Sequence, residues 1–308
     1  MPVFTPSYIM SYETGELSRR AATLTALLKE CVICPWNCRV DRTAPMLHRG
    51  VCRVGRSAMV ANFSPHFFEE PPLTGYGGSG AIFLSYCNLK CVFCQNYDIS
   101  HFGAGLEVSS EELSKMMVML QRQGCHNVNF VAPTHQIAQI IESLPNAIEN
   151  GLSVPLVYNC GGYESVETIK LLDGIFDIYM PDFKYGDDEA ALEYSGTKDY
   201  AERARESIKE MHRQVGDLVL DKNGIAERGL IIRHLVLPCG VARTREVMRF
   251  VAKEISKDSY VNIMGQYRPC HRAAEHPPLD RRVTEKELAE AFIIAKEEGL
   301  HRFAGITE

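Results

Sequence analysis

The sequence predicts an α/β protein built on a parallel β-sheet that is covered by helices. From Gly80 onward, six short apolar segments alternate with amphipathic segments of helical period. A chain of 308 residues is long enough to bury a substantial core. This alternation fits an open doubly wound sheet or a full or partial (β/α) barrel. Both architectures place functional residues at the carboxyl ends of the strands.

Residues 1–75 are expected to form a small N-terminal unit that precedes this domain. A helix is predicted over about 16–30, where leucines recur on one face. A cysteine-rich loop segment follows, over 31–52. Residues 53–75 contain three prolines and are expected to be an irregular connection.

Residues 76–308 are expected to form the α/β domain. The strands are predicted at 81–86, 127–133, 154–160, 176–185, 230–238 and 260–267. The helices are predicted at 108–124, 135–150 with a break near Pro145, 164–173, 199–214, 244–255 and from Thr284 to Gly299. Capping boxes begin the first and last of these helices, at Ser109 with Glu112 and at Thr284 with Glu287.

The composition excludes two classes of partner. The formal net charge is −6 with acids and bases interspersed, so the chain lacks the basic footprint of a nucleic-acid-binding protein. No apolar run reaches the roughly 18 residues of a membrane helix, and the N-terminus lacks the pattern of a signal peptide. The expected location is the cytoplasm.

Eleven cysteines are unusual for a chain in a reducing compartment, and seven of them lie in two tight clusters. Cys87, Cys91 and Cys94 follow the first predicted strand with a CxxxCxxC spacing. Thiolates select soft metals, and a structural zinc site needs four ligands. A [4Fe–4S] cluster held by three cysteines keeps one iron open for another molecule. The alternatives are a disulfide with a spare thiol, or a zinc site completed by a distant residue.

This motif, with Phe93 before its last cysteine, resembles that of the radical S-adenosylmethionine (SAM) superfamily over roughly residues 76–270. The resemblance implies a partial (β/α)6 barrel with a [4Fe–4S] cluster whose open iron chelates SAM. It also implies reductive cleavage of SAM to a 5′-deoxyadenosyl radical, which abstracts a hydrogen atom from a substrate.

Within the superfamily, the sequence resembles the activating enzymes of pyruvate formate-lyase and their uncharacterised relatives. The similar stretches are CVFCQN, with Asn96 two residues after the last cysteine, and also YNCGGY, DIYMPDFKY, LIIRHLVLP and NIMGQYRP. The resemblance implies cofactor contacts by Phe93, Asn96, Asn159, Asp182 and Lys184. It also places Arg233, His234 and Arg268 near the mouth of the barrel. The alternative for Asp182 and Lys184 is an exposed ion pair, and for His234 a structural role.

One stretch departs from the family pattern. The family has a Gly-Gly-Glu stretch after the second strand, whereas this chain has VAPTHQ at 131–136, without a carboxylate. Carbonyl groups beside Pro133 and the hydroxyl of Thr134 are predicted to accept hydrogen bonds from the cofactor amine instead. This difference favours a sister group with a different substrate.

A second metal site is predicted at Cys31, Cys34, Cys38 and Cys52. Four thiols in a short loop-rich segment suit structural zinc, with His48 as a substitute ligand, or a second iron–sulfur cluster that relays electrons. For Cys160, Cys239 and Cys270, the alternatives are a role at the barrel mouth or inert burial.

The sequence therefore predicts a radical SAM enzyme. By resemblance, its substrate would be a glycine of a partner glycyl radical enzyme, and its electron donor a flavodoxin or ferredoxin. The alternatives are modification of a different protein or a small molecule, and a non-catalytic iron–sulfur protein for electron transfer.

Overall fold

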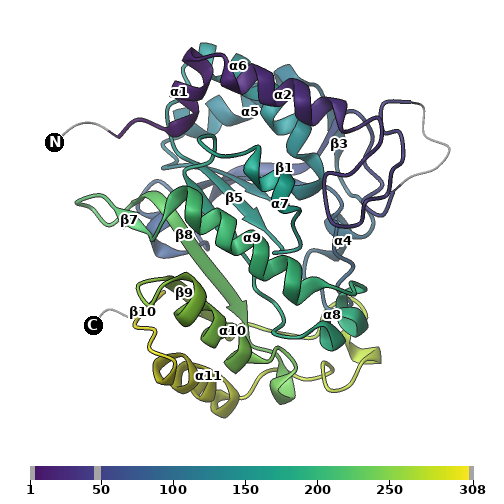
Figure 1. Ribbon diagram of the computed structural model, residues 1–308, viewed down its shortest axis with the longest axis vertical. Coiled ribbons are helices and arrows are strands. Elements are labelled where there is room, and N and C mark those ends of the chain that lie inside the picture. Colours follow the sequence, from purple (N-terminus) through teal and green to yellow (C-terminus); the bar gives the residue numbers. More distant parts are fainter. Residues whose placement is uncertain (1–3, 45–49, 305–308) are drawn as a thin grey trace.

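The computed structural model of the chain describes residues 4–44 and 50–304. A mixed β-sheet forms its centre, and six parallel strands lie side by side in chain order within it (Figure 1). These strands are β2 (Ser79–Leu84), β4 (Val128–Val131), β5 (Leu156–Cys160), β6 (Ile178–Pro181), β8 (Ala226–Leu235) and β9 (Tyr260–Met264). All six predicted strands are confirmed. Sequential parallel strands joined through helices define a partial (β/α)6 barrel.

The sheet remains open in the described part of the chain. Its edges are β3 (Leu106–Val108), which pairs with β1 (Ala58–His66), and β10 (Arg302–Phe303), which pairs with β9. A short strand, β7 (Val219–Leu220), pairs only with β8.

The predicted helices pack around this sheet. They are α5 (Ser110–Arg122), α6 (Ile137–Glu149), α7 (Val166–Lys170), α9 (Tyr200–Val215), α10 (Thr244–Phe250), which continues as a π-helical turn over 251–255, and α11 (Glu285–Glu297). Both capping boxes are formed, at Ser109 and at Thr284. The predicted break near Pro145 is wrong, because α6 continues through that residue. Its apolar face is fully buried, which offsets the one hydrogen bond that a proline removes.

Residues 53–75 are not irregular, which corrects the expectation from their prolines. Over nine residues, β1 pairs antiparallel with β2 and with β3. Pro65 lies near the end of β1 and is paired with Gly80 of β2. The short helix α3 (Pro71–Thr74) follows, with two prolines in its first turn, where the missing N–H groups cost nothing.

A small apolar cluster around Leu73 of α3, called the plug below, fills the end of the barrel opposite the carboxyl ends of the strands. Leu73 of α3 is fully buried and packs with residues from three of the parallel strands, including Val157, Ile178 and Ile231. The segment 69–74 therefore packs against the inner face of the strands, at the end of the barrel opposite their carboxyl ends. This places Glu69 and Glu70 inside the molecule.

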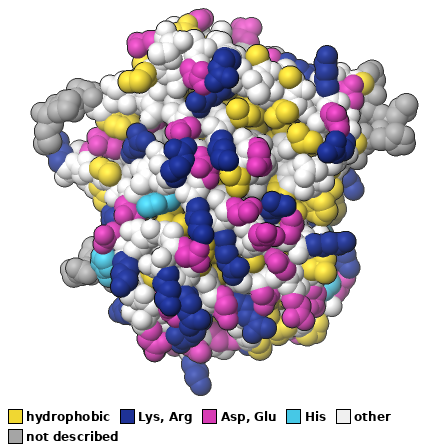
Figure 2. All heavy atoms as spheres, viewed as in Figure 1, with side chains coloured by type: hydrophobic (Ala, Val, Ile, Leu, Met, Phe, Trp, Pro, Cys, Tyr) yellow, Lys and Arg dark blue, Asp and Glu magenta, His cyan; other side chains and the backbone are white. Residues whose placement is uncertain are grey.

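The N-terminal helices α1 (Ser7–Glu13) and α2 (Glu16–Ala26) complete the fold. They lie beside α6 at one end of the molecule in Figure 1, and α2 packs directly against α6. The predicted helix over 16–30 ends as a regular α-helix at Ala26. On the face shown in Figure 2, basic and acidic side chains are interspersed. No helix among the described residues has the length and apolar character needed to cross a membrane.

Candidate functional site

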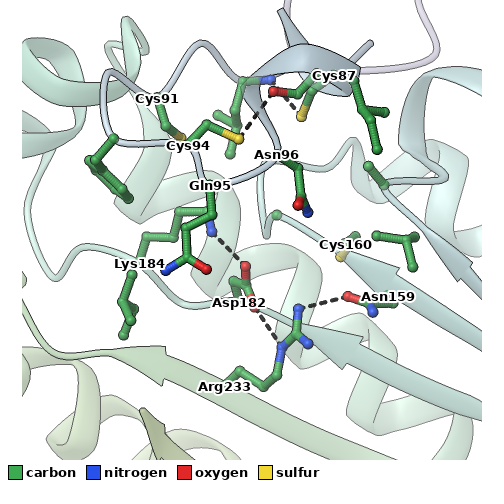
Figure 3. A pocket seen from close by; sticks show the side chains of 18 of the residues that line it. Cys87, Cys91, Cys94, Gln95, Asn96, Asn159, Cys160, Asp182, Lys184 and Arg233 are labelled. Carbon is green, nitrogen blue, oxygen red and sulfur yellow. Dashed lines mark hydrogen bonds and ion pairs between the residues drawn. The ribbon is translucent and has the colours of Figure 1, made fainter. Parts of the chain in front are cut away.

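A cavity of about 310 Å³ lies at the carboxyl ends of the parallel strands. The loop after β2 forms one wall, and it includes the short helix α4 (Tyr97–Ser100). Residues that follow or end β4, β5, β6, β8 and β9 form the rest. Figure 3 shows the three cysteines on one side of this cavity and a layer of charged and amide side chains on the other.

Cys87, Cys91 and Cys94 all line the cavity, and all three are free thiols rather than disulfide partners. Each sulfur has a hydrogen-bonding neighbour: the Leu89 amide donates to Cys87 at 3.3 Å, the Ser195 hydroxyl donates to Cys91 at 2.9 Å, and the Ser100 hydroxyl lies 3.1 Å from Cys94. Hydrogen bonds to sulfur orient ligands and tune the potential of a metal centre.

Burial raises the pKa of Cys87 to about 12 and also raises the pKa of Cys91. These thiols therefore stay protonated at neutral pH until a metal displaces the proton. Among the described residues, no group of three or more His, Cys, Asp or Glu side chains is already arranged around a single metal ion.

A buried ionic layer forms the floor of the cavity. Asp182 bonds the Lys184 ammonium at 2.5 Å and the Arg233 guanidinium at 2.7 Å. Arg233 also donates to the Asn159 side-chain oxygen at 2.7 Å. The side chains of Asp182, Lys184 and Arg233 are each only 15% exposed, so the alternative of an exposed ion pair does not hold.

The charges in this layer stabilise one another. Burial opposes ionisation of Asp182, but Arg233 and Lys184 outweigh it, so the pKa of Asp182 lies below its usual range. Burial also opposes the charge on Lys184, yet Asp182 raises the pKa of this ammonium group. The layer is therefore charged at neutral pH, with two cations around one carboxylate.

Glu69 and Glu70 lie beside Arg233, at 3.4 Å and 3.9 Å from its guanidinium group. Burial raises the pKa of Glu69 to about 7, despite the attraction of Arg233. Asn262 of β9 donates to Glu70 at 2.9 Å. Neither glutamate was predicted from the sequence, because the prolines of segment 53–75 favour an irregular connection.

Aromatic side chains shape the cavity beside the cysteine loop. Phe93 is 5% exposed and packs edge-on against Tyr267 and Tyr185, with ring centroids 5.8 Å and 6.5 Å away. Asn96, at the start of α4, also lines the cavity. Of the predicted contacts, the fold thus gathers Phe93, Asn96, Asn159, Asp182 and Lys184 with the three cysteines.

Pro133, Thr134, His234 and Arg268 are not among the described residues that line the cavity. His234 is fully buried and bonds the Phe183 carbonyl and the Thr244 hydroxyl, which fits its structural alternative. Arg268 is exposed, and Gln266 lines the cavity in its vicinity instead.

Thr134 is buried and donates to a carboxylate that comes from another loop. Its hydroxyl bonds Glu164 at 2.7 Å, and the Tyr158 hydroxyl donates to the same group at 2.8 Å. Burial raises the pKa of Glu164 to about 7. The stretch 131–136 therefore has a carboxylate beside it in space, although it contains none.

The three remaining cysteines of interest do not converge. Cys160 lines the cavity and is buried. Cys239 is exposed, and Arg281 lies 3.1 Å from its sulfur. Cys270 is half-buried and is not among the residues that line the cavity.

The four cysteines of the N-terminal segment come together around a small separate void. Cys31, Cys34, Cys38 and Cys52 all line it, together with Arg42 and His135. His48, the predicted substitute ligand, lies outside the described residues.

The fold and the cavity define a (β/α)-barrel protein with three thiols at the carboxyl edge of its strands. Comparison with known proteins agrees with this class. The sequence profile of the radical SAM superfamily matches residues 81–221. An uncharacterised protein of Methanocaldococcus jannaschii is 33% identical over 284 residues, covering 89% of this chain and 76% of that protein. The chain belongs to the radical SAM superfamily.

Two solved structures are also similar. One is the radical SAM methyltransferase TsrM from Kitasatospora setae, with 15% identity and a TM-score of 0.45, covering 61% of this chain and 36% of that one. The other is HydG, a maturase of the [FeFe]-hydrogenase, with 13% identity and a TM-score of 0.47, covering 74% of this chain and 52% of that one. The chain thus spans about a third and about a half of these two proteins.

Membership of the superfamily implies an enzyme that uses a [4Fe–4S] cluster and SAM. The residues present fit these cofactors. Three free thiols, the soft donors that iron–sulfur clusters require, face one cavity. Opposite them, a charged layer offers both signs of charge to an amino-acid zwitterion.

Proposed function

We propose that Cys87, Cys91 and Cys94 each ligate one iron of a [4Fe–4S] cluster, and that SAM binds between the cluster and the charged floor. The observation that supports this assignment is the shared cavity, which has the three sulfurs on one side and Asp182, Lys184 and Arg233 on the other (Figure 3). When bound, such a cluster supplies the electron that cleaves SAM to a 5′-deoxyadenosyl radical.

The residues of the cavity would orient the cofactor and exclude water. Phe93, fixed by Tyr185 and Tyr267, offers an apolar surface to the adenine ring. Asp182 and Lys184 present a carboxylate and an ammonium group whose positions are fixed by their mutual ion pair. Asn159, held by Arg233, would bond the ribose hydroxyls.

The predicted contacts of Pro133 and Thr134 with the cofactor amine receive no support from the cavity. The carboxylate of Glu164 lies beside that stretch and accepts a hydrogen bond from Thr134. We propose that it supports the loop through its hydrogen bonds rather than through contact with the cofactor.

For the substrate, we propose a protein partner, with a glycyl radical enzyme as the first candidate. Its support is the likeness of the sequence to the activating enzymes, together with an exposed aromatic pair beside the cysteine loop. Tyr97 is 38% exposed and Phe102 is 67% exposed, and their rings contact edge-on at 5.9 Å. Exposed aromatic side chains of this kind are typical of protein interfaces. The electron donor would be a flavodoxin or ferredoxin, and the free thiols suit a reducing compartment such as the cytoplasm.

The test is anaerobic reconstitution with iron and sulfide, followed by reduction and addition of SAM. The expected result is a [4Fe–4S]⁺ EPR signal that shifts with SAM, and formation of 5′-deoxyadenosine. Cys94→Ala should abolish both, whereas Cys239→Ala, at an exposed cysteine outside the cavity, should retain both. A cluster that ignores SAM, with no deoxyadenosine formed, would favour the non-catalytic electron-transfer protein instead.

A further inference from the structure

The four N-terminal cysteines are gathered from two loop segments that have no regular secondary structure. Cys31, Cys34 and Cys52 are each less than 9% exposed, and Cys38 is half-buried. The loop over 31–40 holds Cys31, Cys34 and Cys38. Its two ends are joined by hydrogen bonds, because the Cys31 amide donates to the Val40 carbonyl and the Arg39 amide donates to the Cys31 carbonyl. Four thiols at a buried void are a strong donor set for a soft metal.

Two buried side chains at the void each have one nitrogen atom with no hydrogen-bond partner among the described residues. His135 is 1% exposed, and its Nδ1 atom is unpaired. Arg42 is 2% exposed, its Nε atom is unpaired, and its Nη1 atom lies 3.7 Å from the Cys31 sulfur. Buried polar atoms rarely lack partners, and here both side chains line the void between the sulfurs. A group bound in this void would supply the missing partners of these two nitrogen atoms.

The void also shares a wall with the cysteine loop of the cavity. His135 lines the void, and its Nε2 atom contacts the Ser85 carbonyl at 2.9 Å. The Trp36 indole donates to the Asn88 carbonyl at 2.6 Å, and the Asn88 side-chain oxygen lies 3.7 Å from the Cys87 sulfur. The segment 85–88 therefore contains one cysteine of the cavity, Cys87, and bonds both His135, which lines the void, and Trp36 of the N-terminal cysteine loop.

We infer that Cys31, Cys34, Cys38 and Cys52 bind a metal centre through four thiolates, and that this centre positions the segment 85–88 at the base of the cavity loop. The metal site stands on its own observations, whereas the positioning role rests on the function proposed above. The shared chemistry is tetrathiolate binding, by a zinc ion or by an iron–sulfur cluster.

The first experiment isolates the second site. A variant with Cys87, Cys91 and Cys94 all replaced by alanine is purified without oxygen, and its zinc, iron and acid-labile sulfide are measured per chain. Zinc in a 1:1 ratio, or iron together with sulfide, supports the site and identifies its occupant. Adding Cys34→Ala and Cys52→Ala should remove that metal, and Cys125→Ala, at a buried cysteine outside both sets, should not. No metal above the level of the variant that lacks both sets would overturn the inference.

The second experiment tests the positioning role. Trp36→Phe keeps an aromatic ring but removes the indole donor to Asn88. We expect this variant to keep the N-terminal metal and the unfolding temperature of the wild type. The EPR spectrum of its reconstituted cavity cluster should shift. An unchanged spectrum would overturn the positioning role. Should the cavity cysteines bind no cluster while the triple-alanine variant holds metal, the proposed function fails and the second site stands.

Discussion

At the scale of single residues, Asp182 decides the electrostatics of the cavity floor. Its carboxylate is the counter-ion of Lys184 and Arg233 at once, and all three side chains are nearly buried. Removing one partner of a buried ion pair is costly because it leaves an uncompensated charge in a medium of low polarity. Without Asp182, Arg233 would still have Glu69 and Glu70 as counter-ions. Lys184 forms no other ion pair among the described residues.

Asp182→Asn is therefore expected to lower the free energy of unfolding by about 3 kcal/mol. It should also weaken SAM binding, because the ammonium group of Lys184 loses its fixed position. Urea unfolding and calorimetric titration with SAM measure the two effects. Glu254→Gln, at an exposed pair with Lys209, is the control, and it should cost at most about 1 kcal/mol. Equal losses in the two variants would contradict this account of the floor.

Glu164 makes the stability of the fold depend on pH. Its pKa is raised by burial to about 7 from an ordinary value of 4.5, so the folded state binds a proton that the unfolded state has lost between these values. Stability from this group is therefore fully present below about pH 4.5 and is lost as the pH rises through 7.

Glu164→Gln should remove this dependence while it keeps an acceptor for Thr134 and Tyr158. The difference in unfolding free energy between variant and wild type should move in favour of the variant by about 2 kcal/mol from pH 5 to pH 8. Unfolding curves at these two pH values measure it. A difference that stays constant with pH would show that Glu164 is ionised in the folded protein throughout.

At the scale of elements, the strands and helices of the barrel were predictable because their hydrophobic patterns agree with their local signals. The apolar runs that became β2, β4 and β5 are buried on both faces, and the capping boxes at Ser109 and Thr284 begin helices as expected. β1 was missed because most of its residues are only half-buried and it contains Pro65. Its pairing with β2 is a tertiary contact that no local pattern encodes.

The short helix α3, which carries the plug residue Leu73, was not predicted from the sequence. Leu73→Ala should create a cavity in the plug and lower the free energy of unfolding by about 3 kcal/mol. Leu192→Ala on α8 (Asp188–Ser195), where the side chain is 50% exposed, is the matched control and should change it little. Chemical denaturation of both variants gives the comparison. A loss no larger than that of the control would mean that the plug does not support the strands.

At the scale of the whole molecule, the sequence predicted the parts of the site that lie in short motifs. The cysteine loop with Phe93 follows β2, Asn159 lies at the end of β5, and Asp182 and Lys184 follow β6. The barrel brings the carboxyl ends of these strands to one edge. The sequence did not predict that three other residues belong to the site, because their neighbours in space are distant in the chain. These residues are Glu69, Ser195 and Tyr267. The hydrogen bond from Ser195 to Cys91, for example, joins residues 104 positions apart.

The exposed face beside the cavity allows a test of the partner. Phe102→Ser removes apolar surface next to the cysteine loop without replacing a residue that lines the cavity. With a purified glycyl radical enzyme as the probe, we expect the glycyl radical EPR signal to need about tenfold more partner, as loss of an interface contact worth roughly 1.4 kcal/mol would require. Formation of 5′-deoxyadenosine without the partner should remain at the wild-type level. Ile293→Ser on α11, where the side chain is 57% exposed, should change neither. If Phe102→Ser leaves activation of the partner unchanged, this face does not bind it, and a partner or substrate of another kind must be sought.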